Sequence, residues 1–233
     1  MRILVVNPNT TAAMTDKIAH AARMAAFSGT EIVAVNPDRG PESIEGYYDE
    51  ALAVPGLLTE MRKSPDMDAY IIACFDDTGL DAARCLTGAP VIGIGEAAFH
   101  MASLLGHRFG VVTTLARSIP AIENNLQKYG LSGRCAKVRA ADVPVLDLEH
   151  NHGEAGEKIA TEISISISAD GADAIVLGCA GMADMAHRLS RRFGMPVLDG
   201  VACAVKLAEA LAGIGARTSK LNGYAAPLTK AYR

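Results

Sequence analysis

Short apolar runs and longer stretches with helical periodicity alternate along the whole chain. The runs typical of buried parallel strands cover residues 2–6, 31–35, 70–73, 90–94, 109–113, 174–177 and 196–198, with a strand and loop at 138–148. Helices are predicted between them at 12–26, 49–61, around 82–84, and at 96–105, 118–129, 154–169, 182–193 and 201–213. Thr10 or Thr11 and Ser118 are expected as N-caps. This order predicts βαβ units and parallel sheets with helices on both faces.

The chain contains an internal repeat. In each half an Asp-Ala pair opens an apolar run, and a cysteine stands six residues after the Asp. An apolar run headed by arginine precedes each of these segments, and one opened by proline follows each of them. The matching positions are Arg2 and Arg108, Asp68 and Asp173, Cys74 and Cys179, and Pro90 and Pro196. Agreement at several points indicates an internal duplication.

The duplication predicts the fold class. We expect an α/β protein of two pseudo-symmetric, three-layer domains with parallel sheets, and an active site in the cleft between them. Residues 1–96, completed by about 207–233, are expected to form the first domain, and residues 97–206 the second. The polar tail after Gly215 either packs back on the first half or frays.

Parallel sheets of this kind bind ligands beyond the carboxyl ends of their strands. The residues at these strand ends are Cys74, Cys179, Thr113, Thr114 and the turn Asn7-Pro8-Asn9-Thr10. If the halves face each other, the two thiols flank a single cleft. Gly93-x-Gly95 lacks the third glycine of a dinucleotide fingerprint, and no phosphate loop follows the first strand, so no nucleotide site is predicted.

Two thiols on opposite faces of a substrate can act as a base and an acid. A helix N-terminus after a strand can lower the pKa of such a thiol from about 8.5 towards neutrality. One cysteine then removes a proton from a carbon next to a carbonyl, and the other returns one on the opposite face, with no cofactor. Backbone N–H groups after Cys74 and Cys179 can stabilise the anion. Gly178, Ala180 and Gly181 allow the backbone to approach a ligand closely.

Other interpretations of these residues stay open. Each cysteine alone is typical of a buried apolar position, and a disulfide between Cys74 and Cys179 would indicate a redox role. Asp76 and Asp77 are either carboxylate bases or helix N-caps. A carboxylate near a thiol would raise the thiol pKa, which works against a thiolate.

The remaining cysteines and histidines give weaker signals. Cys85, Cys135 and Cys203 have no partner in the repeat, and Cys203 lies in an amphipathic helix, so we interpret them as structural. His150 and His152 stand on a polar stretch that suggests a metal site. No third ligand follows at a regular spacing, and no metal is predicted.

Composition excludes several classes of function. The net charge is −4, and the chain has 6 Tyr, 5 Phe and no Trp, which argues against a nucleic-acid partner. No apolar run approaches the length of a membrane span or a secretory segment, so we expect a cytoplasmic protein without a membrane partner. Five cysteines without a C-x-x-C pair are expected as free thiols. A homo-oligomer of unspecified size is expected.

A long loop at residues 36–48 follows the second strand and contains several Gly, Pro and Ser residues. Loops of this length are often functional. Ser43 is therefore a candidate ligand contact in a lid or specificity loop, although an ordinary surface loop fits the pattern equally well.

Several segments resemble the aspartate/glutamate racemase superfamily, and within it the hydantoin racemases, with the allantoin racemases as close relatives. They are ILVVNPNTT, GPESIEGYYDE, IIACFDDTGLDAAR, FGVVTT, IVLGCAGMADM and PVLDGVACAVKLAEAL, in matching order over nearly the whole chain. The resemblance implies two similar α/β domains, a cofactor-independent mechanism with two cysteines, and 5-monosubstituted hydantoins as substrates. By matching position it implies Asn9, Ser43, Thr113 and Thr114 as substrate contacts.

The chain departs from the amino-acid racemases of this superfamily. Those enzymes typically follow the first cysteine with Asn-Thr and the second with Thr-His, whereas here Phe75-Asp76 and Ala180-Gly181 follow. An uncharged ring held by backbone donors therefore fits better than free aspartate or glutamate, and Phe75 could pack against the ring or its substituent.

Our hypothesis is racemisation at C5 of a hydantoin, with Cys74 and Cys179 alternating as base and acid. Allantoin is the rival substrate. Amino-acid racemisation, maleate-type isomerisation and decarboxylation are rival reactions that need a carboxylate pocket, and few Arg or Lys residues stand near the cysteines. A non-enzymatic two-domain binding protein is a further alternative. The preferred 5-substituent and the enantiomer that each cysteine serves do not follow from the sequence.

Overall fold

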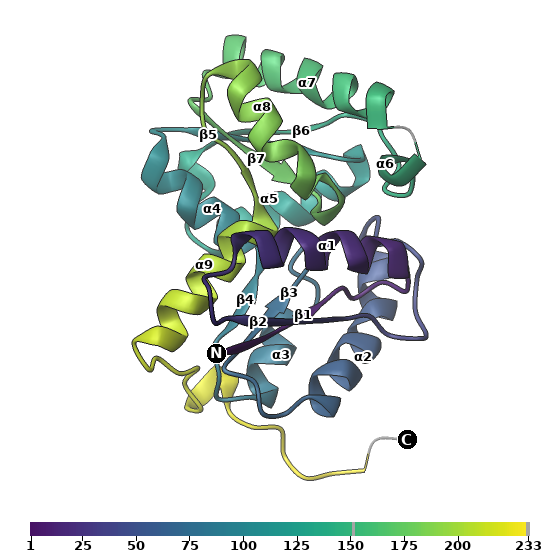
Figure 1. The fold of residues 1–233 in the computed structure, drawn as a ribbon, viewed down its shortest axis with the longest axis vertical. Coiled ribbons are helices and arrows are strands. Elements are labelled where there is room, and N and C mark those ends of the chain that lie inside the picture. Colours follow the sequence, from purple (N-terminus) through teal and green to yellow (C-terminus); the bar gives the residue numbers. More distant parts are fainter. Residues whose placement is uncertain (151, 232–233) are drawn as a thin grey trace.

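The computed structural model describes residues 1–150 and 152–231, without the side chains of residues 149, 150 and 152. Two four-stranded parallel sheets form its framework (Figure 1). The first sheet has the order β2-β1-β3-β4 and consists of β1 (Arg2–Val6), β2 (Glu31–Val35), β3 (Ala69–Ile72) and β4 (Val91–Gly93). The second has the order β6-β5-β7-β8 and consists of β5 (Phe109–Thr113), β6 (Cys135–Ala140), β7 (Ala174–Gly178) and β8 (Val197–Asp199). The two identical strand orders confirm the predicted α/β fold with two similar parallel sheets.

Helices cover both sheets, as the sequence predicts. They are α1 (Ala12–Ala25), α2 (Tyr47–Lys63), α3 (Leu80–Leu86), α4 (Ile94–Leu105), α5 (Ile119–Lys128), α6 (Asp147–His150), α7 (His152–Ser168), α8 (Ala186–Phe193) and α9 (Gly200–Gly213). Short 3-10 turns cover Ala116–Ser118, Ser132–Arg134, Ala180–Met185 and Asn222–Tyr224.

The predicted helix at 182–193 is wrong in its first turn, because a 3-10 turn precedes α8 there. Residues 180–183 are all buried. Four successive buried positions do not fit an amphipathic α-helix with an exposed face.

The repeated aspartates have the same structural role in both halves. The Asp68 carboxylate accepts a hydrogen bond from the backbone nitrogen of Arg2 at 2.7 Å, and the Asp173 carboxylate accepts one from that of Arg108 at 2.9 Å. Each aspartate thus ties the start of the third strand of its half to the start of the first. This shared contact explains why Asp-Ala opens both copies of the repeat.

The two halves share part of one hydrophobic core. Ile3 and Ile71 of the first sheet, Val111 of the second, and residues of α4 and α9 belong to the same buried cluster. Helix α9 packs on α1, α4, β3 and β4; in Figure 1 it begins at the junction of the two halves and runs down beside the first half. The predicted domain boundaries at 96/97 and 206/207 fall inside α4 and α9, so they stay a prediction.

The segment after α9 returns to the first half. Thr218 donates a backbone hydrogen bond to Gly88 at 2.9 Å, and the Tyr224 hydroxyl donates one to Asp81 at 3.0 Å. The Arg84 guanidinium lies over the Tyr224 ring, 5.6 Å from its centroid. Of the two expectations for the tail, packing is observed for this part. None of the helices in the described residues has the length and apolar character that a membrane crossing needs.

Candidate active site

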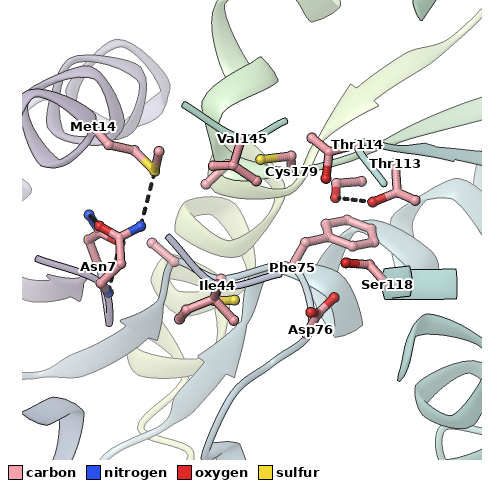
Figure 2. A pocket seen from close by; sticks show the side chains of 15 residues that line it. Asn7, Met14, Ile44, Phe75, Asp76, Thr113, Thr114, Ser118, Val145 and Cys179 are labelled. Carbon is pink, nitrogen blue, oxygen red and sulfur yellow. Dashed lines mark hydrogen bonds between the residues drawn. The ribbon is translucent and has the colours of Figure 1, made fainter. Parts of the chain in front are cut away.

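A pocket lies at the carboxyl ends of the central strands, between the two sheets (Figure 2). Strands β1, β3, β5 and β7 all lead into it. Its lining consists of Asn7, Asn9, Met14, Ile44, Ala73, Cys74, Phe75, Asp76, Thr113, Thr114, Ser118, Val145, Gly178, Cys179 and Ala180. Cysteines from corresponding turns of the two halves thus line one pocket.

Cys74 stands two residues after the end of β3 and is partly buried. The Thr78 hydroxyl donates a hydrogen bond to its sulfur at 3.3 Å. Burial, and then the Asp76 carboxylate, raise the pKa of the Cys74 thiol well above its ordinary value. The expected lowering of this pKa by a helix N-terminus is therefore wrong for Cys74, because α3 begins only at Leu80 and a carboxyl group stands closer.

Cys179 follows β7 and starts the 3-10 turn at 180–185. The preceding Gly178 carbonyl accepts a hydrogen bond from the Thr113 hydroxyl at 2.9 Å. A Cβ on Gly178 would lie 2.8 Å from the Thr113 Cβ, so only glycine allows the ends of β5 and β7 to approach this closely. This packing fixes the backbone from which Cys179 enters the pocket.

Hydroxyl groups and one carboxyl group gather on one side of the pocket around Phe75. Figure 2 shows Thr113, Thr114, Ser118 and Asp76 on this side. Ser118 occupies the expected N-cap position of α5, but its side chain makes no capping hydrogen bond and lines the pocket with 4% exposure.

The Asn-Pro-Asn-Thr turn is held by its own side chains. Asn7 Nδ2 donates to Asn9 Oδ1 at 2.8 Å and to Thr15 Oγ1 at 3.0 Å, and Asn9 Nδ2 donates to the Met14 sulfur at 3.2 Å. Asn9 lines the pocket as predicted, yet its oxygen already accepts from Thr11 N as well. Thr11 is the N-cap of α1 by position, without a capping side-chain bond.

The loop at 36–46 crosses from the first half to the second. The Thr11 hydroxyl donates to the carbonyl of Glu42 at 2.7 Å, and Glu45 accepts a hydrogen bond from the backbone of Val145 at 2.9 Å. Between these anchors Ile44, 8% exposed, lines the pocket. Ser43 and Gly181 are not among the lining residues, so their roles as substrate contacts stay predictions.

The two aspartates after Phe75 differ in role. The Asp77 carboxylate accepts hydrogen bonds from Gly95 N at 2.9 Å, Glu96 N at 2.8 Å and the Tyr129 hydroxyl at 2.8 Å, and so caps α4. A Cβ on Gly93 would lie 2.1 Å from Asp77 Oδ1, which explains the glycine there. Asp76 instead lines the pocket. Burial raises the pKa of Asp76 to about 8 and that of Asp77 to about 7.

Comparison with known proteins agrees with this geometry. The family model described as Asp/Glu/Hydantoin racemase matches residues 3–208. The hydantoin racemase of Rhizobium meliloti is 50% identical over 99% of this chain and 97% of its own. The chain belongs to the Asp/Glu/hydantoin racemase family. It is an enzyme of the racemase class.

Two solved structures show the same arrangement as this racemase-family chain. The allantoin racemase from Klebsiella pneumoniae has a TM-score of 0.97 and 48% identity, over 100% of this chain and 96% of that one. The allantoin racemase from Pseudomonas fluorescens has a TM-score of 0.97 and 44% identity, with both chains covered completely. The relatives of this racemase thus include proteins named for two related substrates.

The other titratable groups singled out in the sequence lie elsewhere. Burial raises the pKa values of Cys135 and Cys203 to about 12, which fits structural thiols in this racemase. Within the described residues, no three His, Cys, Asp or Glu side chains gather as a metal site would require. The side chains of His150 and His152 lie outside that description.

Sequence reasoning missed five lining residues as possible substrate contacts: Asn7, Met14, Ile44, Ala73 and Val145. It treated Ser118 only as a cap. The apolar members carry no chemical signal in a sequence, since Met14 matches the apolar face of its helix. Ile44 had one usable signal, because it is an isolated apolar residue within a polar loop.

Proposed function

We propose that this racemase inverts C5 of 5-monosubstituted hydantoins by two-base proton transfer between Cys74 and Cys179, without a cofactor. One observation carries the proposal: the repeated cysteines, one from each half, line the same small pocket. A thiolate on one face removes the C5 proton, the electron pair moves into the adjacent carbonyl, and the thiol on the other face returns a proton.

The lining supports a neutral substrate. No Arg or Lys stands among the described residues that line the pocket, whereas the rival substrates, free amino acids and dicarboxylates, need a cation to balance their carboxylates. Hydroxyls and a carboxyl group can bind the amide edges of a hydantoin ring. Met14, Ile44 and Val145 offer an apolar surface to a 5-substituent.

Cys74 has a defined starting state. Because burial raises its pKa well above the ordinary value, Cys74 is a thiol before the substrate binds. It is therefore suited to donate the proton to the enantiomer whose hydrogen faces Cys179. The reverse reaction requires that Cys74 act as the base once the substrate is bound.

Allantoin is the second candidate substrate. It is a hydantoin with a ureido group at C5, and both solved structures compared above carry the name allantoin racemase. The chemistry at C5 is the same, so the distinction depends on the subsite for the substituent. A cytoplasmic homo-oligomer stays our expectation for the assembly.

The test is deuterium incorporation at C5 of L- and D-5-alkylhydantoins and of allantoin in heavy water, followed by NMR and polarimetry. Wild type and Cys85→Ser, whose thiol lies outside the pocket, should exchange both enantiomers. Cys74→Ser and Cys179→Ser should each lose racemisation by about a thousandfold or more, with residual exchange confined to one enantiomer. Near wild-type racemisation by either variant would refute the two-cysteine assignment.

A further inference from the structure

Asp76 is a buried carboxyl group that the fold does not use. The residue is 8% exposed and lines the pocket, and its two carboxyl oxygens form no hydrogen bond within the described part of the chain. Its backbone groups are engaged instead: the carbonyl accepts a hydrogen bond from Asn125 Nδ2 at 2.8 Å, and the backbone hydrogen-bonds the Cys74 sulfur. Buried polar groups are nearly always hydrogen-bonded, so an unsatisfied carboxyl group that faces a pocket indicates a ligand contact.

The neighbour Asp77 shows what a structural carboxylate looks like in the same turn. It accepts three hydrogen bonds, from Gly95, Glu96 and Tyr129, none of them from the pocket. Because Asp77 fulfils the capping role, the turn needs no second carboxyl group for its stability. The separation of roles leaves Asp76 available for the substrate.

The surroundings of Asp76 disfavour its charged form. Glu50 on α2 and Asp77 in the same turn repel a negative charge on it, and no cation lines the pocket among the described residues. The Oε1 atom of Glu50 is itself buried without a hydrogen-bond partner. Burial and these two carboxyl groups raise the pKa of Asp76 to about 8. At neutral pH the carboxyl group thus retains its proton and can donate it in a hydrogen bond.

We propose that Asp76 binds the substrate as a neutral carboxylic acid that donates a hydrogen bond to the carbonyl oxygen next to the reacting carbon. This inference rests on the proposed function. Asp76 stands two residues after Cys74 in the turn that follows β3, so it lies near the carbon that Cys74 serves. When the C5 proton leaves, the electron pair moves towards the C4 carbonyl, and its oxygen becomes the enolate oxygen.

In this role Asp76 keeps its proton throughout the reaction, and only the hydrogen bond strengthens as charge develops on the substrate oxygen. A neutral donor has a second advantage over a carboxylate at this position. An ionised Asp76 would repel both the enolate and the Cys74 thiolate. The acid form stabilises the enolate by a hydrogen bond and exerts no charge repulsion on the thiolate. The same turn thus supplies both a thiol and an anion-stabilising donor.

The first test compares Asp76→Asn and Asp76→Ala with Asp81→Asn, an exposed aspartate outside the pocket, over pH 6 to 9. At neutral pH Asp76→Asn, which still donates from its amide, should stay within about tenfold of the wild-type kcat/KM. Asp76→Ala should lose about 10²–10³-fold, mainly in kcat, as expected for the loss of an anion-stabilising donor. A decline of wild-type activity as Asp76 ionises near pH 8 should be absent in Asp76→Asn.

An ionised Asp76 that accepts from a ring N–H gives the opposite result. Wild-type activity would then rise through the same pH range, and the inference would be overturned. Equal losses in the Asn and Ala variants, with an unchanged pH profile, would also overturn it and indicate a purely structural residue. If neither wild type nor Asp81→Asn inverts C5 of any hydantoin, the proposed function itself fails, and this inference fails with it.

A second measurement needs no substrate. In protein labelled with ¹³C at the aspartate carboxyl carbons, the Asp76 resonance is assigned by its absence from Asp76→Asn. It should titrate near pH 8. A resonance that stays in the carboxylate position from pH 5 to 9 would overturn the inference even in a fully active racemase.

Discussion

The Glu45 carboxylate accepts a hydrogen bond from the backbone nitrogen of Val145 at 2.9 Å, which joins the first half of the chain to the second across the mouth of the pocket. Both ends of this bond adjoin the pocket lining, because Ile44, which precedes Glu45, and Val145 itself both line the pocket. The bond therefore fixes two apolar walls of the substrate site at once.

Removing this bond should weaken substrate binding. Glu45→Ala should raise KM about 3- to 10-fold with a smaller effect on kcat, because one hydrogen bond contributes roughly 1 kcal/mol. Glu45→Gln, which keeps an acceptor oxygen, should stay close to wild type. The control is Glu42→Ala, since Glu42 is exposed and its hydrogen bond with Thr11 uses the backbone carbonyl, which the substitution keeps. If Glu42→Ala raises KM as much as Glu45→Ala, the crossing bond has no special role.

Ile44 should set the preferred size of the 5-substituent. Shortening it to Ala removes apolar volume from the pocket wall, so the ratio of kcat/KM for benzylhydantoin over methylhydantoin should rise about tenfold. Ile44→Phe should lower the same ratio. Steady-state kinetics with both substrates gives the answer, and an unchanged ratio in both variants would place the substituent elsewhere in the pocket.

Asp77 should be a stability residue. Asp77→Ala leaves the first N–H groups of α4 and the Tyr129 hydroxyl without their acceptor, and should lower the free energy of unfolding by about 2–4 kcal/mol. Tyr129→Phe removes one of the three bonds and should cost about 1 kcal/mol. Urea denaturation measures both, with Asp66→Ala, at an exposed position, as the control. A loss for Asp77→Ala no larger than that of the control would contradict the capping role.

The stability of the protein should fall as the pH rises above about 5. Asp76 and Asp77 have folded-state pKa values of about 8 and about 7, above the value near 4 of an unfolded chain. The folded state therefore binds more protons between these values. The contribution is fully present below pH 4 and is lost as the pH rises through 7 to 8.

Urea denaturation at pH 5.5 and 8.5 measures this difference in the free energy of unfolding. Asp76→Asn cannot ionise, so the difference should be smaller in this variant than in wild type, while Asp81→Asn should match wild type. If the free energy of unfolding changes between the two pH values by the same amount in wild type and in Asp76→Asn, Asp76 does not titrate in this range.

The repeat in the sequence was sufficient to predict the fold and the central pair of the candidate site. Strand positions followed from apolar runs, and the two cysteines followed from their equal place after the Asp-Ala pairs. Both signals are local or periodic, and parallel strands bring their carboxyl ends together by topology alone. The helix at 154–169 also formed, despite its β-prone ISISIS segment, because its buried face packs on β5 and β6.

The parts that sequence reasoning missed depend on contacts between distant segments. Whether Ser43 or Ile44 faces the pocket is decided by the anchors of the loop at Thr11 and Val145. Whether Asp76 or Asp77 caps a helix is decided by α4, which lies about twenty residues further along the chain. Neighbouring residues of similar chemistry cannot be told apart until the tertiary structure assigns their directions.

The position of α9 sets the order in which the chain can fold during its synthesis. The first half comes off the ribosome first, but its core is completed by α9 and by the contacts of Thr218 and Tyr224, which are made last. The nascent first sheet must therefore wait, with the faces of α1, β3 and β4 uncovered, until α9 and the segment after it have been synthesised. Such delayed closure exposes apolar surface to aggregation, and slow translation between the first half and α9 should make this protein more dependent on chaperones.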